Sequence, residues 1–237
     1  MTVGIATMPF VLMYHSVDTY EHDPHLITVS PDRFDRQMRW LQARGLRGVS
    51  VRELLDAQAA GSARGLVALT FDDGYADFAT RVTPLLVRYG FTATVFMVAG
   101  HVAGRNEWDD GPRKPLMDHQ QLRAVADVGM EVASHGLRHR RLPDLTESEL
   151  HEELHGSRDV LERMIDRPVR GFAYPYGVLT AREAEAVEKA GYDYGCAIWD
   201  EHPCRHALAR TYVGERDHRL RLTAKALRHR LRWRTRI

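Results

Sequence analysis

Two adjacent carboxylates and two histidines are the residues of this chain whose types and spacing could do chemistry. Asp72 and Asp73 follow the apolar, β-branched run at 66–71, which is typical of a buried strand. At a strand end the two carboxylates repel each other and lose hydration, a cost that a bound cation removes. His135 and His139 stand four residues apart, which predicts two imidazoles on one face of a helical turn. One carboxylate and two histidines make a three-ligand site for zinc or a similar ion, and the other carboxylate is left to take a proton from water.

These residues must be positioned by strands that alternate with helices along the chain. Pro31 behind Ser30 predicts a helix start, and Thr146 with Glu149 predicts a capping box. The alternation predicts a parallel α/β sheet or barrel, a class of fold in which active sites gather at the carboxyl ends of the strands. The expected strands cover 10–14, 66–71, 92–98, 130–133, 171–174 and 192–198, and the expected helices begin near 31, 75, 118, 147 and 180.

Length and composition predict one globular domain. The 237 residues are enough for one sizeable core, and 44% hydrophobic with 27% charged residues is an ordinary balance. The apolar stretch at 3–14 has no Lys or Arg and is interrupted by Pro9, so it does not resemble a signal peptide. No apolar run approaches the ~20 residues that span a bilayer. We therefore expect a cytoplasmic protein, and we expect Cys196 and Cys204 to be free thiols.

Residues 218–237 differ from the rest of the chain in charge. They hold eight Arg and Lys residues and no acid, so the net charge of +1 for the whole chain leaves −7 on residues 1–217. We divide the chain here into a main domain, 1–217, and a basic C-terminal helix or tail, 218–237. The favoured interpretation is a helix that packs Leu220, Leu227 and Leu231 onto the domain with its arginines in water. A basic tail can also bind anionic lipid, nucleic acid or a polyanionic glycan.

The residues singled out first resemble the motifs of the polysaccharide deacetylases of carbohydrate esterase family four. The family's T-F-D-D-G is matched in full at 70–74. Its H-[S/T]-x-x-H is matched by His135 and His139, with Gly136 in the Ser/Thr position, and its R-x-P-[F/Y] is matched in part at 173–176. The motifs occur in the family's order, and the resemblance covers most of the main domain. It implies a distorted (β/α) barrel that forms a single catalytic domain.

The resemblance implies a role for each residue of the first two motifs. Asp73, His135 and His139 would be the metal ligands, and Asp72 would be the general base that deprotonates metal-bound water. The metal would be Zn²⁺, with Co²⁺ and Ni²⁺ as alternatives. The backbone N–H of Tyr75, at a helix start, would hold the oxyanion of a tetrahedral intermediate. The alternative without a metal is that Asp73 caps this helix and the histidines are surface polar groups.

The family's general acid has no match at its usual place. The family takes it from a C-terminal L-x-H, whereas this chain reads Ala-Leu-Ala-Arg at 207–210, with His206 nearby. A branch with permuted sequence order, which includes deacetylases of bacterial biofilm poly-N-acetylglucosamine, has an N-terminal Y-H and takes the acid from that histidine. Tyr14-His15 matches this pair, so the resemblance assigns the general acid to His15. The alternative for His15 is a packed histidine satisfied by the backbone, and His206 is then the next residue to test.

Two further motifs depart from the family pattern. Ala173 replaces the arginine that pairs with the catalytic aspartate, and D-x-x-D-W keeps Trp199 but neither aspartate. Their joint absence avoids an unpaired buried charge, and we expect Arg210 to partner Asp72 instead. Aromatic faces suit pyranose rings, so two tyrosines would wall the sugar site while Trp199 and Leu208 form the acetyl pocket; plain core packing is the alternative for the first tyrosine. The residues expected around the substrate are Tyr174, Pro175, Tyr176, Trp199, Leu208 and Arg210.

These assignments predict a metal-dependent N-deacetylase, a hydrolase of linear amide C–N bonds. It would remove acetyl groups from an amino-sugar glycan, oligosaccharide or small glycoside. Two alternatives remain open: an amidase that acts on a non-sugar amide, and a non-catalytic sugar-binding relative, against which the intact set of acids and histidines argues. Carbohydrate is the expected partner and nucleic acid is not. Contact of the basic C-terminus with a membrane surface and the oligomeric state stay open.

Overall fold

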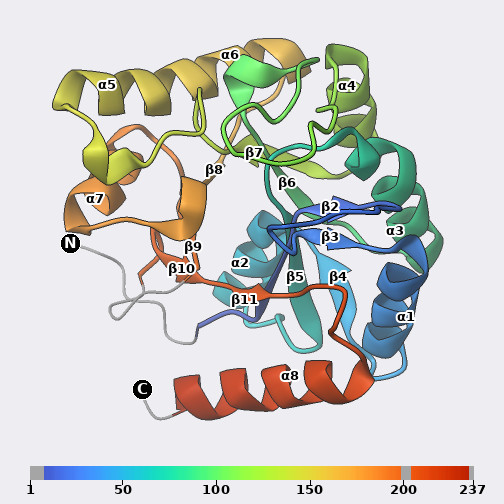
Figure 1. Cartoon of the computed structure of the whole chain (residues 1–237). Coiled ribbons are helices and arrows are strands. Elements are labelled where there is room, and N and C mark those ends of the chain that lie inside the picture. Colours follow the sequence, from blue (N-terminus) through green and yellow to red (C-terminus); the bar gives the residue numbers. More distant parts are fainter. Residues whose placement is uncertain (1–7, 199–203, 235–237) are drawn as a thin grey trace.

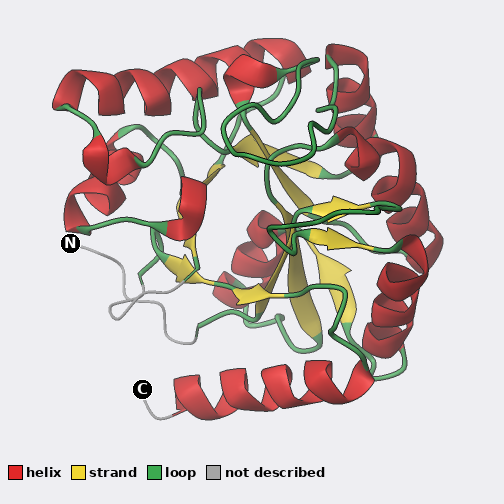
Figure 2. Ribbon diagram, in the orientation of Figure 1, coloured by secondary structure: helices red, strands yellow, loops and turns green. Residues whose placement is uncertain are grey.

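Nine parallel strands form one sheet that curls almost into a closed barrel (Figures 1 and 2). The computed structural model describes residues 8–198 and 204–234. A separate two-stranded sheet consists of β2 (Ser16–Val17) and β3 (Thr28–Val29). The strands of the main sheet are β1 (Val11–Tyr14), β4 (Arg47–Val49), β5 (Leu66–Phe71), β6 (Thr94–Met97), β7 (Glu131–Ser134), β8 (Gly171–Ala173), β9 (Tyr194–Ala197), β10 (Leu208–Ala209) and β11 (Thr211–Tyr212).

The order of the strands explains how the barrel closes. Neighbouring strands follow the path β10-β9-β8-β7-β6-β5-β1-β11, and β4 pairs with the first half of β5. The two ends of this path, β10 and β11, are separated in the chain by Arg210 alone. The chain itself therefore joins the two edges of the sheet, and the predicted distorted (β/α) barrel is confirmed.

Helices surround the sheet, and the capping predicted for two of them is present. Ser30, which precedes Pro31, caps its helix by accepting a hydrogen bond at Oγ from the Arg33 N–H. Thr146 forms a capping box with Glu149. No helix in the described part of the chain is long and apolar enough to cross a bilayer. The helices are α1 (Pro31–Gln42), α2 (Val51–Ala59), α3 (Thr83–Tyr89), α4 (His119–Asp127), α5 (Glu147–His151), α6 (Ser157–Ile165), α7 (Ala181–Lys189) and α8 (Arg219–Arg234).

Successive residues of a strand face two different hydrophobic clusters, as the pleat requires. In β5, Leu69 and Phe71 belong to the larger cluster, which includes side chains of α1, α3 and α4 and so lies between sheet and helices. Ala68 belongs to the smaller cluster inside the barrel, where Cys196 of β9 lies as a free thiol, as predicted. The same alternation turns residue 70, and then Asp72, toward the barrel interior.

The basic C-terminal segment forms α8, but the face that packs on the domain is not the predicted one (Figure 1). Leu222 and Trp233 are buried, whereas Leu220, Leu227 and Leu231 are exposed. The predicted packing of those three leucines is therefore wrong. The helix has two apolar faces, and the one with Leu222 and Trp233 packs on the domain.

Glu131, at the start of β7, is buried where α2 covers one end of the barrel. Its carboxylate accepts hydrogen bonds from the Thr94 hydroxyl at 2.6 Å and from the backbone N–H of Arg52 at 3.2 Å. Burial nevertheless dominates and raises the pKa of this carboxyl above its ordinary value. The folded chain therefore keeps a proton on Glu131 at pH values where the unfolded chain has released it.

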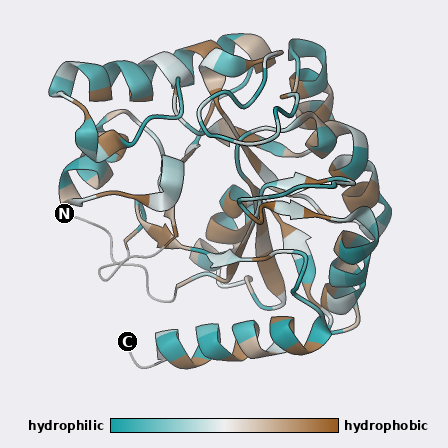
Figure 3. Cartoon of the chain, viewed as in Figure 1, coloured by the Kyte–Doolittle hydropathy of each residue, from teal (hydrophilic) through white to brown (hydrophobic). Residues whose placement is uncertain are grey.

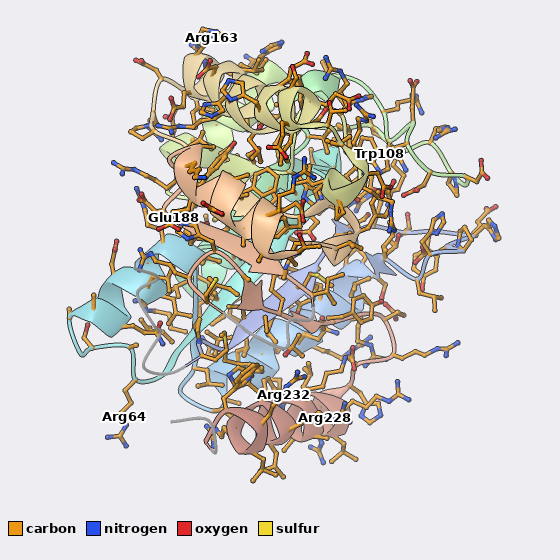
Figure 4. All side chains as sticks on the ribbon, turned by 90° about the vertical axis from the view of Figure 1, so that its left-hand side faces the viewer. Arg64, Trp108, Arg163, Glu188, Arg228 and Arg232 are labelled. Atoms are coloured by element: carbon orange, nitrogen blue, oxygen red, sulfur yellow. The ribbon has the colours of Figure 1, made fainter. Side chains whose placement is uncertain are left out.

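We expect Glu131→Gln to change how stability depends on pH. In the wild type, the contribution of Glu131 to the free energy of unfolding falls as the pH rises above 4.5, the ordinary carboxyl pKa. Glutamine has no proton to lose, so the variant should gain stability relative to the wild type as the pH rises. Urea unfolding at a series of pH values measures the difference. Glu188→Gln, an exposed position on α7 (Figure 4), should show no such trend, and parallel curves for wild type and Glu131→Gln would contradict the prediction.

Candidate metal centre and active site

Asp73, His135 and His139 meet at the carboxyl end of the barrel, just past β5 and β7. The Nε2 atoms of His135 and His139 lie 3.5 and 3.4 Å from Oδ1 of Asp73. One potential ligand atom from each residue lies within 4.8 Å of the other two, and all three side chains are buried. Among the described residues, no other set of three acidic, His or Cys side chains converges in this way.

The chemistry of these side chains fits a divalent metal ion. The Nδ1–H of His135 donates to the carbonyl of Ala173 at 2.8 Å, which fixes the tautomer and leaves the Nε2 lone pair free as a ligand. Burial lowers the pKa of His135 to about 4, so the ring is neutral, as metal binding requires. Two imidazole nitrogens and one carboxylate oxygen form a donor set that suits zinc and leaves coordination positions open.

The two histidines approach each other through a loop, not through the predicted helical turn. No helix is present between β7 and residue 142. Gly136 (φ 83°) and His139 (φ 56°) have left-handed backbone conformations that fold the loop back on itself. The carboxylate of Glu153 holds this fold by accepting the backbone N–H groups of Leu137 and Arg138 at 2.8 and 3.0 Å. Sequence analysis missed Glu153, because only the folded chain brings it to this loop.

Asp72 faces the barrel interior and forms a two-pronged ion pair with Arg210. The guanidinium NH1 and NH2 donate to the two carboxylate oxygens at 2.6 and 2.7 Å. Burial alone would raise the pKa of Asp72, but the charge and hydrogen bonds of Arg210, together with the neighbouring histidines, outweigh burial and hold the pKa of this carboxyl below its ordinary value. The predicted pairing of Arg210 with Asp72 is confirmed, and it keeps Asp72 ionised.

Arg210 does not line the substrate site, and that expectation is wrong. Its side chain is fully buried, and its Nε donates to the carbonyl of Ala197 at 3.1 Å while NH1 also approaches the hydroxyl of Thr70 at 3.3 Å. The guanidinium is therefore buried among protein acceptors and acts through Asp72.

The turn at 73–75 gives Tyr75 an unpaired amide beside the ligands. Asp73 (φ 72°) and Gly74 (φ 77°) are both left-handed, and a Cβ at Gly74 would overlap the Met97 sulfur, so only glycine fits there. Helical structure begins at Ala76, one residue later than predicted. No hydrogen-bond acceptor within the described ranges meets the Tyr75 N–H. The amide is therefore free to donate to a ligand, as the oxyanion role requires.

His15 lies beside Asp72 at the end of β1. Tyr14 and Phe71 are paired in register, and the Asp72 N–H donates to the Tyr14 carbonyl at 3.0 Å. A positive charge on His15 would lower the pKa of both Asp72 and Asp73, so the imidazole is within electrostatic reach of both carboxylates. Its Nδ1 is buried and, within the residues that the structure describes, has no hydrogen-bond partner. The structure thus places His15 beside the two aspartates of the predicted site.

Two aromatic rings flank His139 and form a rim around the ligands. Trp108 stacks on the imidazole with ring centroids 4.5 Å apart, and Tyr176 packs edge-on at 4.7 Å. The Tyr176 hydroxyl donates a hydrogen bond to Asp109 at 3.1 Å. This bond connects the segment after β8 with the loop after β6, which carries Trp108. Sequence analysis assigned Tyr176 but missed Trp108 (Figure 4) and Asp109. The signal available was an aromatic residue and acids in the loop that follows β6, at the same edge of the barrel.

Two residues expected around the substrate lie in the hydrophobic core. Tyr174 is completely buried, and its hydroxyl donates to the carbonyl of His206 at 2.6 Å. Leu208 is completely buried in the cluster inside the barrel. Neither side chain can touch a sugar from these positions, so their assignment to the substrate site is wrong. The core-packing alternative for Tyr174 is the one the structure supports.

The remaining assignments have different outcomes. Pro175 is buried under the metal-ligand loop, where a Cβ on Gly136 would lie 3.9 Å from its ring. Trp199 lies outside the described residues. His206 is buried, with Nε2 bonded to the carbonyl of Tyr192 at 2.9 Å, near the amino end of β9. That end of the strand is opposite the metal ligands, so His206 is not a substitute for His15.

Comparison with known proteins agrees with this site. A family model described as polysaccharide deacetylase matches residues 60–195. The Bacillus subtilis (strain 168) protein YxkH, named provisionally as a polysaccharide deacetylase, is 27% identical over 187 residues, covering 78% of this chain and 62% of that protein. Poly-beta-1,6-N-acetyl-D-glucosamine N-deacetylase of Staphylococcus aureus (strain MSSA476) is 24% identical over 181 residues, covering 72% of this chain and 61% of that protein.

The chain thus spans about three fifths of the length of the curated relatives it matches. Its fold is that of a solved structure, the Streptococcus pyogenes deacetylase PplD in complex with acetate. The TM-score is 0.80 at 22% identity, and the match covers 94% of this chain and 99% of that one. Because the family model matches more than half of the residues and includes both aspartates and both histidines of the site, this chain belongs to the polysaccharide deacetylase family.

Proposed function

We propose that this chain is a metal-dependent hydrolase that removes N-acetyl groups from an amino-sugar substrate. The observation that carries the proposal is the arrangement at the carboxyl end of the barrel. A carboxylate held ionised by a buried arginine lies beside a three-ligand metal site, with a free amide and a histidine at its edge. Family membership and the name of the Staphylococcus aureus relative support deacetylation as the reaction.

Asp73, His135 and His139 would hold the metal ion, for which Zn²⁺ is the best match to the donors. The ion would supply Lewis acidity, which acidifies water and polarises a carbonyl. Asp72 accepts the proton of the attacking water, because Arg210 keeps it ionised and fixed in orientation. The Tyr75 N–H donates to the developing oxyanion. His15 gives a proton to the departing amine, since an amine leaves poorly as an anion.

The rim favours a carbohydrate substrate. Trp108 and Tyr176 present aromatic surface next to His139, and pyranose rings have apolar faces that stack on such surfaces. Tyr176 is partly exposed at this rim, so among the described residues of the predicted substrate set it is the one placed to contact a sugar. A polymer, an oligosaccharide and a small glycoside all fit this description.

The first prediction for this site distinguishes the roles of the two adjacent aspartates. Asp72→Asn should retain the metal but lower acetate release about 10²–10⁴-fold, because the base is lost. Asp73→Asn and His135→Ala should lose bound metal, since three protein ligands are the minimum for such a site. The measurements are elemental analysis and acetate release from N-acetylglucosamine oligosaccharides, with and without chelator. Asp56→Asn, an exposed position on α2, is the control. Full activity in metal-free protein would refute the proposed function, and activity restricted to non-sugar amides would refute its substrate.

The second prediction concerns the proton donor. His15→Ala should slow cleavage of an N-acetyl amide far more than cleavage of a nitrophenyl acetate ester, because nitrophenolate departs without a proton. Metal content should stay unchanged. Rates on both substrates and elemental analysis measure this. Equal losses on the two substrates would show that His15 only supports the structure.

The third prediction tests Arg210 as a positioning residue. Arg210→Met leaves Asp72 buried without a counter-charge, which should lower the free energy of unfolding by about 3–5 kcal/mol. The double variant Asp72→Asn, Arg210→Met should recover part of this stability but no activity. Urea unfolding of the wild type, both single variants and the double variant gives the coupling. Arg167→Met breaks an exposed ion pair with Asp127 and should cost far less. Additive effects of the two single variants would contradict this role.

A further inference from the structure

Helix α8 carries a row of leucines on the face that points away from the domain. Leu220, Leu227 and Leu231 are 66%, 56% and 58% exposed. At 100° per residue, positions 220, 227 and 231 fall within a narrow sector of the helix surface. We call these three side chains the leucine stripe. Figure 3 shows that hydrophobic (brown) and hydrophilic (teal) residues alternate along this helix. Exposed apolar patches rimmed by polar residues mark sites of interaction with proteins or membranes.

The opposite face of α8 is fastened to the domain, so the leucine stripe cannot turn inward. Leu222 and Trp233 are buried there. The Thr223 hydroxyl accepts a hydrogen bond from Arg44 at 2.9 Å, and Lys225 bonds to the carboxylate of Asp217 at 2.6 Å. The His229 ring packs against Phe10, with centroids 4.8 Å apart. These contacts fix the rotation of the helix about its axis.

Exposed arginines border the leucine stripe on both sides. In the helical projection, Arg219 and Arg230 lie along one flank, and Arg221 and Arg228 lie along the other, with Arg232 beyond them. Among the described residues none of these guanidinium groups forms an ion pair, and the sequence has no acid from 218 to 237. The outer face of α8 is therefore an apolar strip between two cationic borders, on a molecule whose first 217 residues carry a net negative charge.

We propose that α8 docks this chain onto an anionic phospholipid surface. The leucine stripe would enter the boundary between headgroups and acyl chains, and the bordering arginines would pair with lipid phosphates. The leucines favour a lipid surface over other polyanions. Nucleic acid or a polyanionic glycan would pair with the arginines but would leave the leucine stripe in water. The charges decide against a second copy of the chain, because two such faces brought together would oppose arginine to arginine with no acid between them.

Vesicle flotation of the full chain tests the proposal. Binding should occur to vesicles of phosphatidylcholine with phosphatidylglycerol, should be much weaker to phosphatidylcholine alone, and should fall with ionic strength. The triple variant Leu220→Ser, Leu227→Ser, Leu231→Ser removes the stripe. The double variant Arg221→Gln, Arg228→Gln removes two border charges and should lower the partition coefficient roughly tenfold to thirtyfold, from about 1 kcal/mol per cation near an anionic surface.

Matched controls change the same residue types elsewhere. Val87→Ser and Val128→Ser alter exposed apolar side chains, and Arg64→Gln with Arg163→Gln alters exposed arginines that lie outside α8 (Figure 4). All four should leave vesicle binding unchanged. Because every altered side chain is exposed, the thermal unfolding midpoint should stay the same and rule out misfolding. The readout needs no catalysis, so it is independent of the proposed function.

Three results would overturn the proposal. They are equal binding to neutral and anionic vesicles, equal loss of binding in the control variants, and no binding to anionic vesicles. In the last case, sedimentation of the chain without lipid identifies the other occupant. A change from dimer to monomer in the leucine variant would show that the stripe joins two copies.

Discussion

The ion pair between Asp72 and Arg210 is the interaction on which the rest of the site depends. Arg210 is the one residue between β10 and β11, so it stands where the two edges of the sheet meet. Its guanidinium reaches through the barrel interior to a carboxylate at the end of β5. Two buried charges are tolerated here because each satisfies the other in a bidentate geometry, and the guanidinium also donates to the Ala197 carbonyl and the Thr70 hydroxyl. The residue that joins the two edges of the barrel is therefore also the one that keeps Asp72 ionised.

That pairing lets two neighbouring carboxylates do different work. The alternation of β5 directs Asp72 into the barrel, and the left-handed backbone at Asp73 turns the next carboxylate toward His135 and His139. Asp72 is paired with Arg210, and Asp73 lies beside the two histidines. The repulsion expected between the adjacent carboxylates is therefore reduced at each of them. The strained backbone at Asp73, Gly74 and His139 is concentrated where ligands must converge, a common feature of active sites.

Charge and burial also organise the surface of the molecule. Helix α8 buries Leu222 and Trp233 against the domain and leaves its other three leucines outside with the arginines. The described arginine side chains of this helix stay in water, and Trp233 belongs to the smaller hydrophobic cluster that fills the barrel.

The sequence by itself determined the alternation of strands and helices, the metal-ligand set and the adjacency of base and ligand, because these rest on short patterns of apolar and polar residues. It also indicated Arg210, because a buried acid needs a partner, and the resemblance to the permuted branch of the family indicated His15. Only the tertiary structure decided the geometry of contacts between distant segments: the bidentate geometry in which Arg210 meets Asp72, the stacking of Trp108 on His139, and the burial of Tyr174. It also decided which apolar face of α8 is buried. Periodicity shows that a helix has such faces, but only the surface it meets selects between them.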